Sequence, residues 1–150
     1  GIISNVTPPG GGTTDYAVEI FYSAIRDRHY TCFVRPDTIL PMMYMPDCIK
    51  ATMDLMETDP SKLAHHADFN LAAMSFSADE LASEIQVHIP EFKVTYEPDP
   101  VKQAIADSWP MTIDDSAARE EWGWRPDYDL ASMTLDMIEK LGNRHKSGEL

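Results

Sequence analysis

A run of small and hydroxyl-bearing residues, Gly10-Gly11-Gly12-Thr13-Thr14, precedes a strongly periodic helical segment and is the first candidate for chemistry. Free N–H groups at a helix start attract anions, and two hydroxyls beside them can bind a carboxylate or a phosphate. The glycines lack GxGxxG spacing, and no Lys-Ser/Thr pair follows them. They therefore favour a flexible active-site or surface loop. Thr13 and Thr14 are binding candidates, with helix capping as the alternative explanation.

Trp109 is the second candidate, because it lies between Ser108 and Pro110 in a segment expected to be a loop. An aromatic side chain in that position is suited to line a cleft, since ligand pockets are largely apolar. Trp122 and Trp124 flank the end of a predicted short helix, and we expect both to contribute to the core. Trp109 is therefore the aromatic candidate for a cleft wall.

Other residue types with catalytic or metal-binding chemistry show no pattern that indicates a site. His65 and His66 are adjacent, which would direct them apart on a regular element, so a solvated loop pair is favoured. Cys32 and Cys48 match no zinc spacing and are expected to be buried thiols, with a disulfide as the alternative. The sequence has no GxSxG motif. We therefore predict no metal site and assign no catalytic residue to this chain.

Alternating strand-like and helix-like segments must position these candidates, and they predict an α/β or α+β domain. The apolar spacing from residue 15 and the capping box Ser77-Ala78-Asp79-Glu80 predict helices most clearly. We expect one domain over residues 1–142 and a frayed polar tail over 143–150. Strands are expected at 1–6, 30–34, 39–45, 69–74 and 92–97, and helices from residues 15, 46, 77, 99 and 115, with a last one ending near 141.

Composition and charge narrow the classes of partner. The 150 residues carry 12 Lys and Arg against 25 Asp and Glu, which gives a formal net charge of −13. Such a balance repels phosphate backbones and anionic lipid heads, so we expect neither nucleic acid nor membranes as partners. No apolar run reaches the roughly 18 residues of a membrane span, and no signal-peptide pattern opens the chain. These observations predict an intracellular globular domain.

Six segments together resemble the C-terminal half of the NAD-dependent L-threonine 3-dehydrogenases, a family of the extended short-chain dehydrogenase/reductase superfamily. The resemblance extends to about Leu141, and GGGTTDYA and ADSWP are its most specific motifs, whereas WGWRP is shared with sugar-nucleotide epimerases and dehydratases. The segments are GIIS at 1–4, GGGTTDYA at 10–17, LPMMYMPD at 40–47, NLAAMSF at 70–76, QAIADSWP at 103–110 and AREEWGW at 118–124.

The resemblance implies the substrate-side lobe of a Rossmann-type parent, with an incomplete nucleotide-binding sheet. It implies oxidation of the C3 hydroxyl of L-threonine to 2-amino-3-oxobutyrate, with NAD as cofactor and a Tyr-Lys pair removing the proton. The family's GxxGxxG motif is absent here, and no tyrosine of this chain has a lysine four residues after it. We therefore expect an N-terminal Rossmann half to supply both motifs, and the isolated chain to be inactive.

The resemblance also implies roles for five residues. Thr13 or Thr14 and Trp109 are expected to position L-threonine, and Gly1 and Ile2 to contact the nicotinamide end of the cofactor. The parent enzyme is expected to form a homodimer or a larger homo-oligomer. Bacterial members of the family are cytoplasmic and eukaryotic members mitochondrial, so the compartment depends on the source.

Two alternatives lead to different expectations. A fragment of a nucleotide-sugar epimerase or dehydratase would need arginines for a diphosphate, and Arg26, Arg28 and Arg35 are the ones available. A non-catalytic binding domain would have a closed core of its own. The dehydrogenase fragment, in contrast, predicts exposed apolar surface on strand 1–6 and on the first helix.

Overall fold

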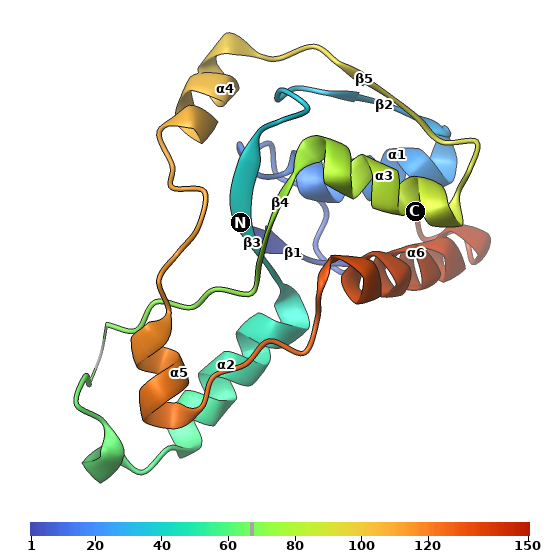
Figure 1. Cartoon of the computed structure of the whole chain (residues 1–150). Helices are drawn as coiled ribbons and strands as arrows, with labels where there is room; N and C mark the ends of the chain where they lie inside the picture. Colours follow the sequence, from blue (N-terminus) through green and yellow to red (C-terminus); the bar gives the residue numbers. More distant parts are fainter. Residues whose placement is uncertain (67) are drawn as a thin grey trace.

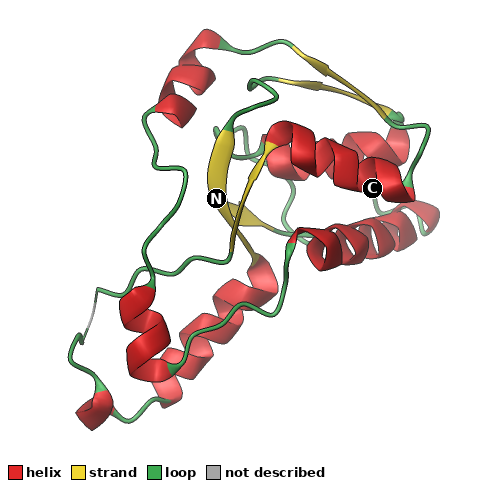
Figure 2. Cartoon of the chain, viewed as in Figure 1, coloured by secondary structure: helices red, strands yellow, loops and turns green. Residues whose placement is uncertain are grey.

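The computed structural model describes residues 1–66 and 68–150, and it contains a main body with an arm projecting from it (Figure 1). Helices predominate, and the strands are short (Figure 2). In chain order the elements are β1 (Ile2–Ile3), α1 (Tyr16–Arg26), β2 (His29–Cys32), β3 (Ile39–Tyr44), α2 (Met45–Glu57), the 3-10 helix η1 (Pro60–Lys62), β4 (Met74–Ser77), α3 (Ala78–His88), β5 (Lys93–Tyr96), α4 (Pro100–Asp107), α5 (Ser116–Trp122) and α6 (Leu130–Lys146).

The strands form two small sheets. In the first sheet, β3 lies between β1 and β4; β1 runs parallel to β3, and β4 runs antiparallel to it. In the second sheet, β2 and β5 are parallel, and Tyr30 lies opposite Val94. Parallel strands need long crossover connections, and the segment between β2 and β5 contains α2 and α3. The α/β class with a partial sheet is therefore confirmed.

Helix α1 is the centre of the main body. The β2–β5 sheet lies on one side of α1 and α3, and α6 lies on the other (Figure 1). Because apolar residues occur almost all round α1, most of its side chains can be buried against these elements. Its buried residues are Tyr16, Ala17, Val18, Ile20, Phe21, Tyr22, Ala24 and Ile25.

The expectation of an exposed apolar first helix is wrong. Ile20 is 1% exposed and Phe21 is fully buried, as is Ile3 of β1 at 1%. Helices α3 and α6 cover this face of α1 from within the same chain. Ile2 is 53% exposed and Val6 is 72% exposed, so apolar surface is present on the first strand and the segment after it.

The arm consists of α2, η1 and α5, and it has a small core of its own. Trp124 is 1% exposed and packs with Ala51 and Ala118, as predicted for a core tryptophan, while Trp122 is partly buried against them. Within the described residues, Cys48 on α2 and Cys32 in the main body are free thiols, so no disulfide joins them. Burial raises the pKa of the Cys32 thiol to about 11.

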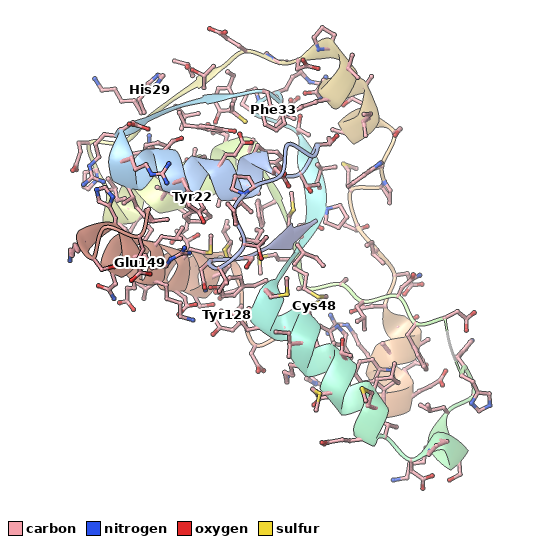
Figure 3. The ribbon with its side chains drawn as sticks, turned by 180° about the vertical axis from the view of Figure 1, so that it is seen from behind. Tyr22, His29, Phe33, Cys48, Tyr128 and Glu149 are labelled. Atoms are coloured by element: carbon pink, nitrogen blue, oxygen red, sulfur yellow. The ribbon has the colours of Figure 1, made fainter. Side chains whose placement is uncertain are left out.

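A buried carboxylate fixes the arm to the main body. Asp47, which is 1% exposed, accepts hydrogen bonds from the backbone N–H groups of Asp127 at 2.8 Å and Tyr128 at 3.2 Å. The Tyr128 ring packs edge-to-face on Tyr44 at 4.9 Å between centroids, beside the start of α2 (Figure 3). The connection between α5 and α6 is therefore held at the point where the arm begins.

Some element boundaries differ from those predicted. The strand expected at 69–74 is found at Met74–Ser77, where it pairs with β3. The last helix continues to Lys146, within the segment expected to be a polar tail. The capping box is confirmed: Ser77 Oγ accepts from the Glu80 N–H, and the Glu80 carboxylate accepts from the Ser77 N–H.

Among the described residues, no helix is long and apolar enough to cross a bilayer. In the same residues, no cluster of three or more His, Cys, Asp or Glu side chains could hold a metal ion.

The adjacent histidines lie in a loop, as predicted, but His65 has a partner there. Its Nδ1 contacts the carboxylate of Glu121 on α5, which also accepts from the N–H groups of Ala64 at 2.8 Å and His65 at 3.0 Å. The hydrogen bond and the negative charge raise the pKa of His65, and the same contacts lower the pKa of Glu121. The loop is thereby attached to α5.

Phe21→Ala tests whether α1 is the core of the chain. Removing a fully buried aromatic ring is expected to lower the free energy of unfolding by about 3–5 kcal/mol, measured by urea denaturation. Val87→Ala, at a position 68% exposed on α3, is the control and should change it by less than about 0.5 kcal/mol. Equal losses in both variants would contradict the buried position of α1.

The His65–Glu121 contact predicts a pH dependence. Because the folded-state pKa of His65 is raised, its contribution to stability is complete below the unfolded value of about 6.5 and is lost as pH rises through the raised pKa. NMR titration of the His65 ring should therefore give a pKa above the usual histidine value of about 6.5, and Glu121→Gln should lower it. An unchanged His65 pKa in that variant would show that the contact does not form in solution.

Candidate functional site

Two surface cavities lie on either side of Ile2. The loop cavity, about 360 Å³, is bounded by β1, the loop after it and the starts of α1 and α2; the strand cavity, about 220 Å³, is bounded by β1, β3 and the segment before α5. The loop cavity is lined by Ile2, Ser4, Thr7, Pro8, Pro9, Gly10, Asp15, Val18 and Met45, and the strand cavity by Gly1, Ile2, Pro41, Met42, Met43, Leu71 and Ile113.

The glycine loop is attached to the start of α1. One carboxylate oxygen of Asp15, Oδ2, accepts hydrogen bonds from the N–H groups of Gly10 at 2.7 Å, Gly11 at 2.7 Å and Gly12 at 2.9 Å. Gly11 has a φ of +96°, a conformation that favours glycine and that brings successive N–H groups to one point. The three backbone N–H groups that could bind a phosphate are thus already bonded to Asp15. The Asp15 carboxylate makes no capping hydrogen bond to α1.

Ser4 fixes the other end of the same loop. It is 6% exposed, and its hydroxyl accepts from the N–H groups of Val6 at 3.1 Å and Thr7 at 3.2 Å. The intervening segment, Pro8 to Gly12, therefore runs between two side-chain anchors. Sequence reasoning missed the anchoring roles of Ser4 and Asp15. An acidic residue three positions after a glycine run was the available signal for Asp15.

Thr14 and Gly1 lie in direct contact. A Cβ atom built on Gly1 would be 2.7 Å from Thr14 Cβ and 2.7 Å from Met42 Sδ, so only glycine fits there. Thr13 and Thr14 are both half-buried, and no hydrogen bond within the described residues uses either hydroxyl. Gly1 and Ile2 line the strand cavity, and Thr14 contacts Gly1, but neither Thr13 nor Thr14 itself lines either cavity.

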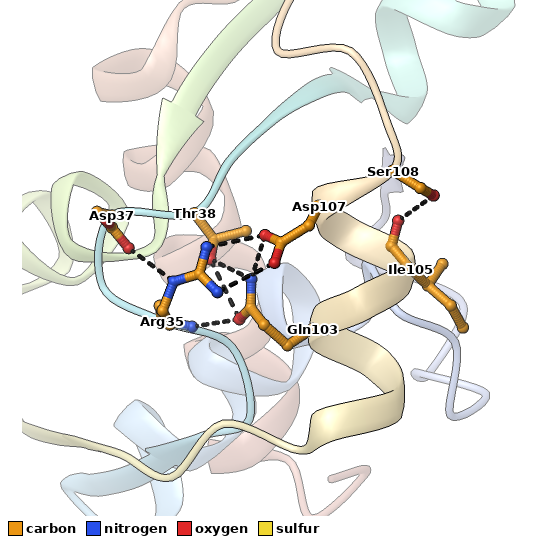
Figure 4. A network of polar contacts seen from close by, with 7 residues as sticks. All are labelled: Arg35, Asp37, Thr38, Gln103, Ile105, Asp107 and Ser108. Atoms are coloured by element: carbon orange, nitrogen blue, oxygen red, sulfur yellow. Dashed lines mark hydrogen bonds and ion pairs between the residues drawn. The ribbon is translucent and has the colours of Figure 1, made fainter.

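Trp109 lies at the end of α4 and is 41% exposed. The backbone N–H of Trp109 donates to the Ala106 carbonyl at 3.1 Å. The neighbouring Ser108 hydroxyl donates to the Ile105 carbonyl at 2.7 Å (Figure 4). The Trp109 side chain lines neither cavity, whereas Ile113, four residues further on, lines the strand cavity. The segment that carries Trp109 therefore reaches the site, but Trp109 is not placed against Thr14.

A polar network fixes α4 and hence the start of that segment. Arg35, before β3, donates to both carboxylate oxygens of Asp107, at 3.1 and 2.8 Å (Figure 4). Gln103, 6% exposed, accepts from the Arg35 N–H at 2.8 Å and donates to Asp107 at 2.8 Å. The Arg35 guanidinium and the Gln103 amide lower the pKa of Asp107, so the carboxylate is ionised and the pairing persists at neutral pH.

The arginines considered for a diphosphate contact other groups. Arg26 lies over the Tyr22 ring at 5.3 Å, and Arg28 pairs with Glu91 at 3.3 Å and donates to the Ala24 carbonyl. Arg35 is engaged with Asp107, and none of the three lines a cavity beside Ile2. The geometry of the two cavities therefore suits a small ligand with polar groups better than a diphosphate.

Comparisons with known proteins identify the chain's relatives. The chain is 50% identical over 146 residues to the mitochondrial L-threonine 3-dehydrogenase of Bos taurus, covering 97% of the chain and 39% of that protein. It is 51% identical over 147 residues to an uncharacterized epimerase/dehydratase of Staphylococcus haemolyticus, covering 98% of the chain and 46% of that protein. No family model matches the chain.

Among solved structures, the L-threonine dehydrogenase of Clostridium difficile superposes with a TM-score of 0.93 at 50% identity, covering 96% of this chain and 45% of that one. The fold is thus that of a short-chain dehydrogenase/reductase of the epimerase-like type. More particularly, the chain is similar over nearly its whole length to L-threonine 3-dehydrogenases and to proteins named as epimerases or dehydratases. It spans less than half the length of the curated relatives it matches.

Proposed function

We propose that the protein containing this chain oxidises the C3 hydroxyl of L-threonine to 2-amino-3-oxobutyrate with NAD, and that this chain forms the substrate-side wall. The observation that carries the proposal is the 50% identity to bovine L-threonine 3-dehydrogenase over 97% of the chain. The TM-score of 0.93 to the Clostridium difficile enzyme supports it. The reaction requires a site for a small amino acid, a proton acceptor and a hydride acceptor.

The start of α1 offers groups suited to the amino acid. The two threonine hydroxyls, Thr13 and Thr14, lie at the positive end of the helix, where a substrate carboxylate is stabilised by the helix dipole and by hydrogen bonds. Trp109 would exclude water from the bound substrate, which strengthens electrostatic interactions in the site. For Trp109 to reach the substrate, the segment from Ser108 to Ile113 must bring it towards the strand cavity.

The fit to NAD is limited to one end of the cofactor. Ile2 presents an exposed apolar side chain between the two cavities, suited to the nicotinamide end. At Gly1, however, Met42 and Thr14 already leave no room for a side chain. The presence of glycine there is therefore not evidence for a bound cofactor. Bound NAD would supply the hydride acceptor. The phosphate-binding loop and the Tyr-Lys pair would come from outside these 150 residues, because neither motif occurs in them.

The exposed apolar surfaces support a nucleotide-binding half as partner. Besides Ile2, the α2 residues Ile49, Met53 and Met56 are 57%, 49% and 75% exposed, and their spacing puts them on one helix face. A Rossmann half packed on β1 and α2 would cover them. We also propose that the whole enzyme is a homodimer or a larger homo-oligomer. Its proposed location is the cytoplasm for a bacterial source and the mitochondrion for a eukaryotic one.

The epimerase or dehydratase reaction is the second candidate, favoured by the names of the Staphylococcus haemolyticus and Staphylococcus aureus relatives. It requires cationic side chains around a diphosphate, and Arg26, Arg28 and Arg35 contact other groups. The closed core around α1 is what a non-catalytic binding domain predicts, but the 50% identity to a dehydrogenase over 97% of the chain favours part of an enzyme. Both alternatives therefore have less support than threonine oxidation.

The experiment that tests the proposal is a threonine oxidation assay that follows NADH absorbance. We expect turnover by the full-length protein containing this segment and none by the isolated 150 residues. In the full-length protein, Thr13→Ala, Thr14→Ala and Trp109→Ala should each lower kcat/KM for threonine. A threonine variant that loses a hydrogen bond to the charged substrate should lower it by roughly ten- to 150-fold.

Thr31→Ala is the matched control, because Thr31 is an exposed threonine on β2 that contacts Thr95. This variant should keep the wild-type kcat/KM. Turnover by the isolated chain would contradict the assignment of catalytic groups to the other half. Wild-type kinetics in all three site variants would show that the substrate is bound elsewhere.

A further inference from the structure

We infer that Asp15 is a positioning residue for the substrate site: its carboxylate holds the loop Pro8–Gly12 against the start of α1 and thereby fixes Thr13 and Thr14. The inference takes the identity of the substrate from the proposed function. The geometry on which it rests is a set of hydrogen bonds to Asp15. Three consecutive N–H groups converge on a single oxygen, Oδ2, at 2.7, 2.7 and 2.9 Å. Hydrogen bonds to an ionised carboxylate are stronger than neutral ones.

Few other contacts hold this loop. Gly10, Gly11 and Gly12 are exposed and have no side chains to pack, so apolar burial cannot fix them. Glycine also loses more conformational freedom on ordering than any other residue. One further bond joins the Asp15 N–H to the Gly12 carbonyl at 3.2 Å. Without the carboxylate, the three glycines would sample many conformations, and the adjoining Thr13 would move with them.

The helix start gives the carboxylate a rigid base. Asp15 directly precedes Tyr16 and Ala17, which are both fully buried in the core of the main body. An aspartate at this position commonly caps its own helix, whereas here its side chain makes no capping bond and instead bonds backward to the loop. Asp15 also lines the loop cavity together with Gly10. The residue therefore connects the fixed helix to the movable wall of the cavity.

Two measurements on the full-length protein test this role, with Asp15→Asn and Asp15→Ala as variants. Hydrogen exchange at the amides of Gly11 and Gly12 should become about tenfold faster or more as the charge-assisted bonds are lost. Exchange at Ile20 and Phe21 should stay unchanged, since both are buried in the core. In steady-state kinetics the KM for threonine should rise about tenfold, whereas the KM for NAD should stay within about twofold.

Asp59→Asn is the matched control, because Asp59 also accepts a backbone N–H, from Ser61 at 2.9 Å, but does so at the start of η1 in the arm. It should leave both the loop exchange and the threonine KM at wild-type values. Asp15→Glu, which keeps the charge, should restore part of the threonine affinity that Asp15→Asn loses.

Three outcomes would overturn the inference. Wild-type exchange at Gly11 and Gly12 in Asp15→Asn would show that the carboxylate does not hold the loop. Faster loop exchange with an unchanged threonine KM would show that the loop does not position the substrate. Faster exchange at Ile20 and Phe21 as well would indicate a general loss of stability. Because exchange needs no substrate, it reports on the loop even if the wild-type protein fails to oxidise threonine, which would refute the proposed function separately.

Discussion

The burial of α1 is the constraint on which the rest of the structure depends. Its apolar side chains are covered by β2 on one side, by α6 on the other and by α3 beside it. A helix buried on so much of its surface cannot shift without opening the core, because protein interiors are close-packed. Its first residue is therefore a fixed point. Asp15 and Thr14 directly precede it, and so the core determines where the proposed substrate-binding groups lie.

Around this fixed helix, the site is assembled from parts held by polar contacts. Asp15 and Ser4 hold the two ends of the glycine loop, and the Arg35–Asp107 pair holds α4, from which the Trp109 segment departs. The Asp15 and Arg35–Asp107 contacts are exposed, and such contacts contribute little to global stability. They instead restrict segments that have few apolar contacts. A rigid core with movable walls suits an enzyme whose substrate must enter and leave.

Local signals made part of this predictable from the sequence. The capping box at Ser77 and Glu80 and the apolar spacing of α1 depend on residues three or four apart, so both were identified correctly. The position of β4 depends on pairing with β3, more than thirty residues earlier, and it was misplaced. The burial of Phe21 was missed for the same reason, since α3 and α6 cover it from distant parts of the chain. The proposed site residues were identified from the resemblance of sequence motifs. The role of the Asp15 carboxylate could not be identified in this way, because it depends on the path of the loop backbone.

The central claim is that the loop and the start of α1 form the substrate wall of a threonine dehydrogenase. Its most direct test is an NMR titration of L-threonine into the full-length protein loaded with NADH, which cannot accept the hydride, with the backbone amides and the Trp109 indole assigned. The account predicts saturable shifts at Gly10–Thr14 and at the Trp109 indole, and none at His65 in the arm. Shifts confined to other regions, or an absence of saturable shifts at Thr13 and Thr14, would contradict it.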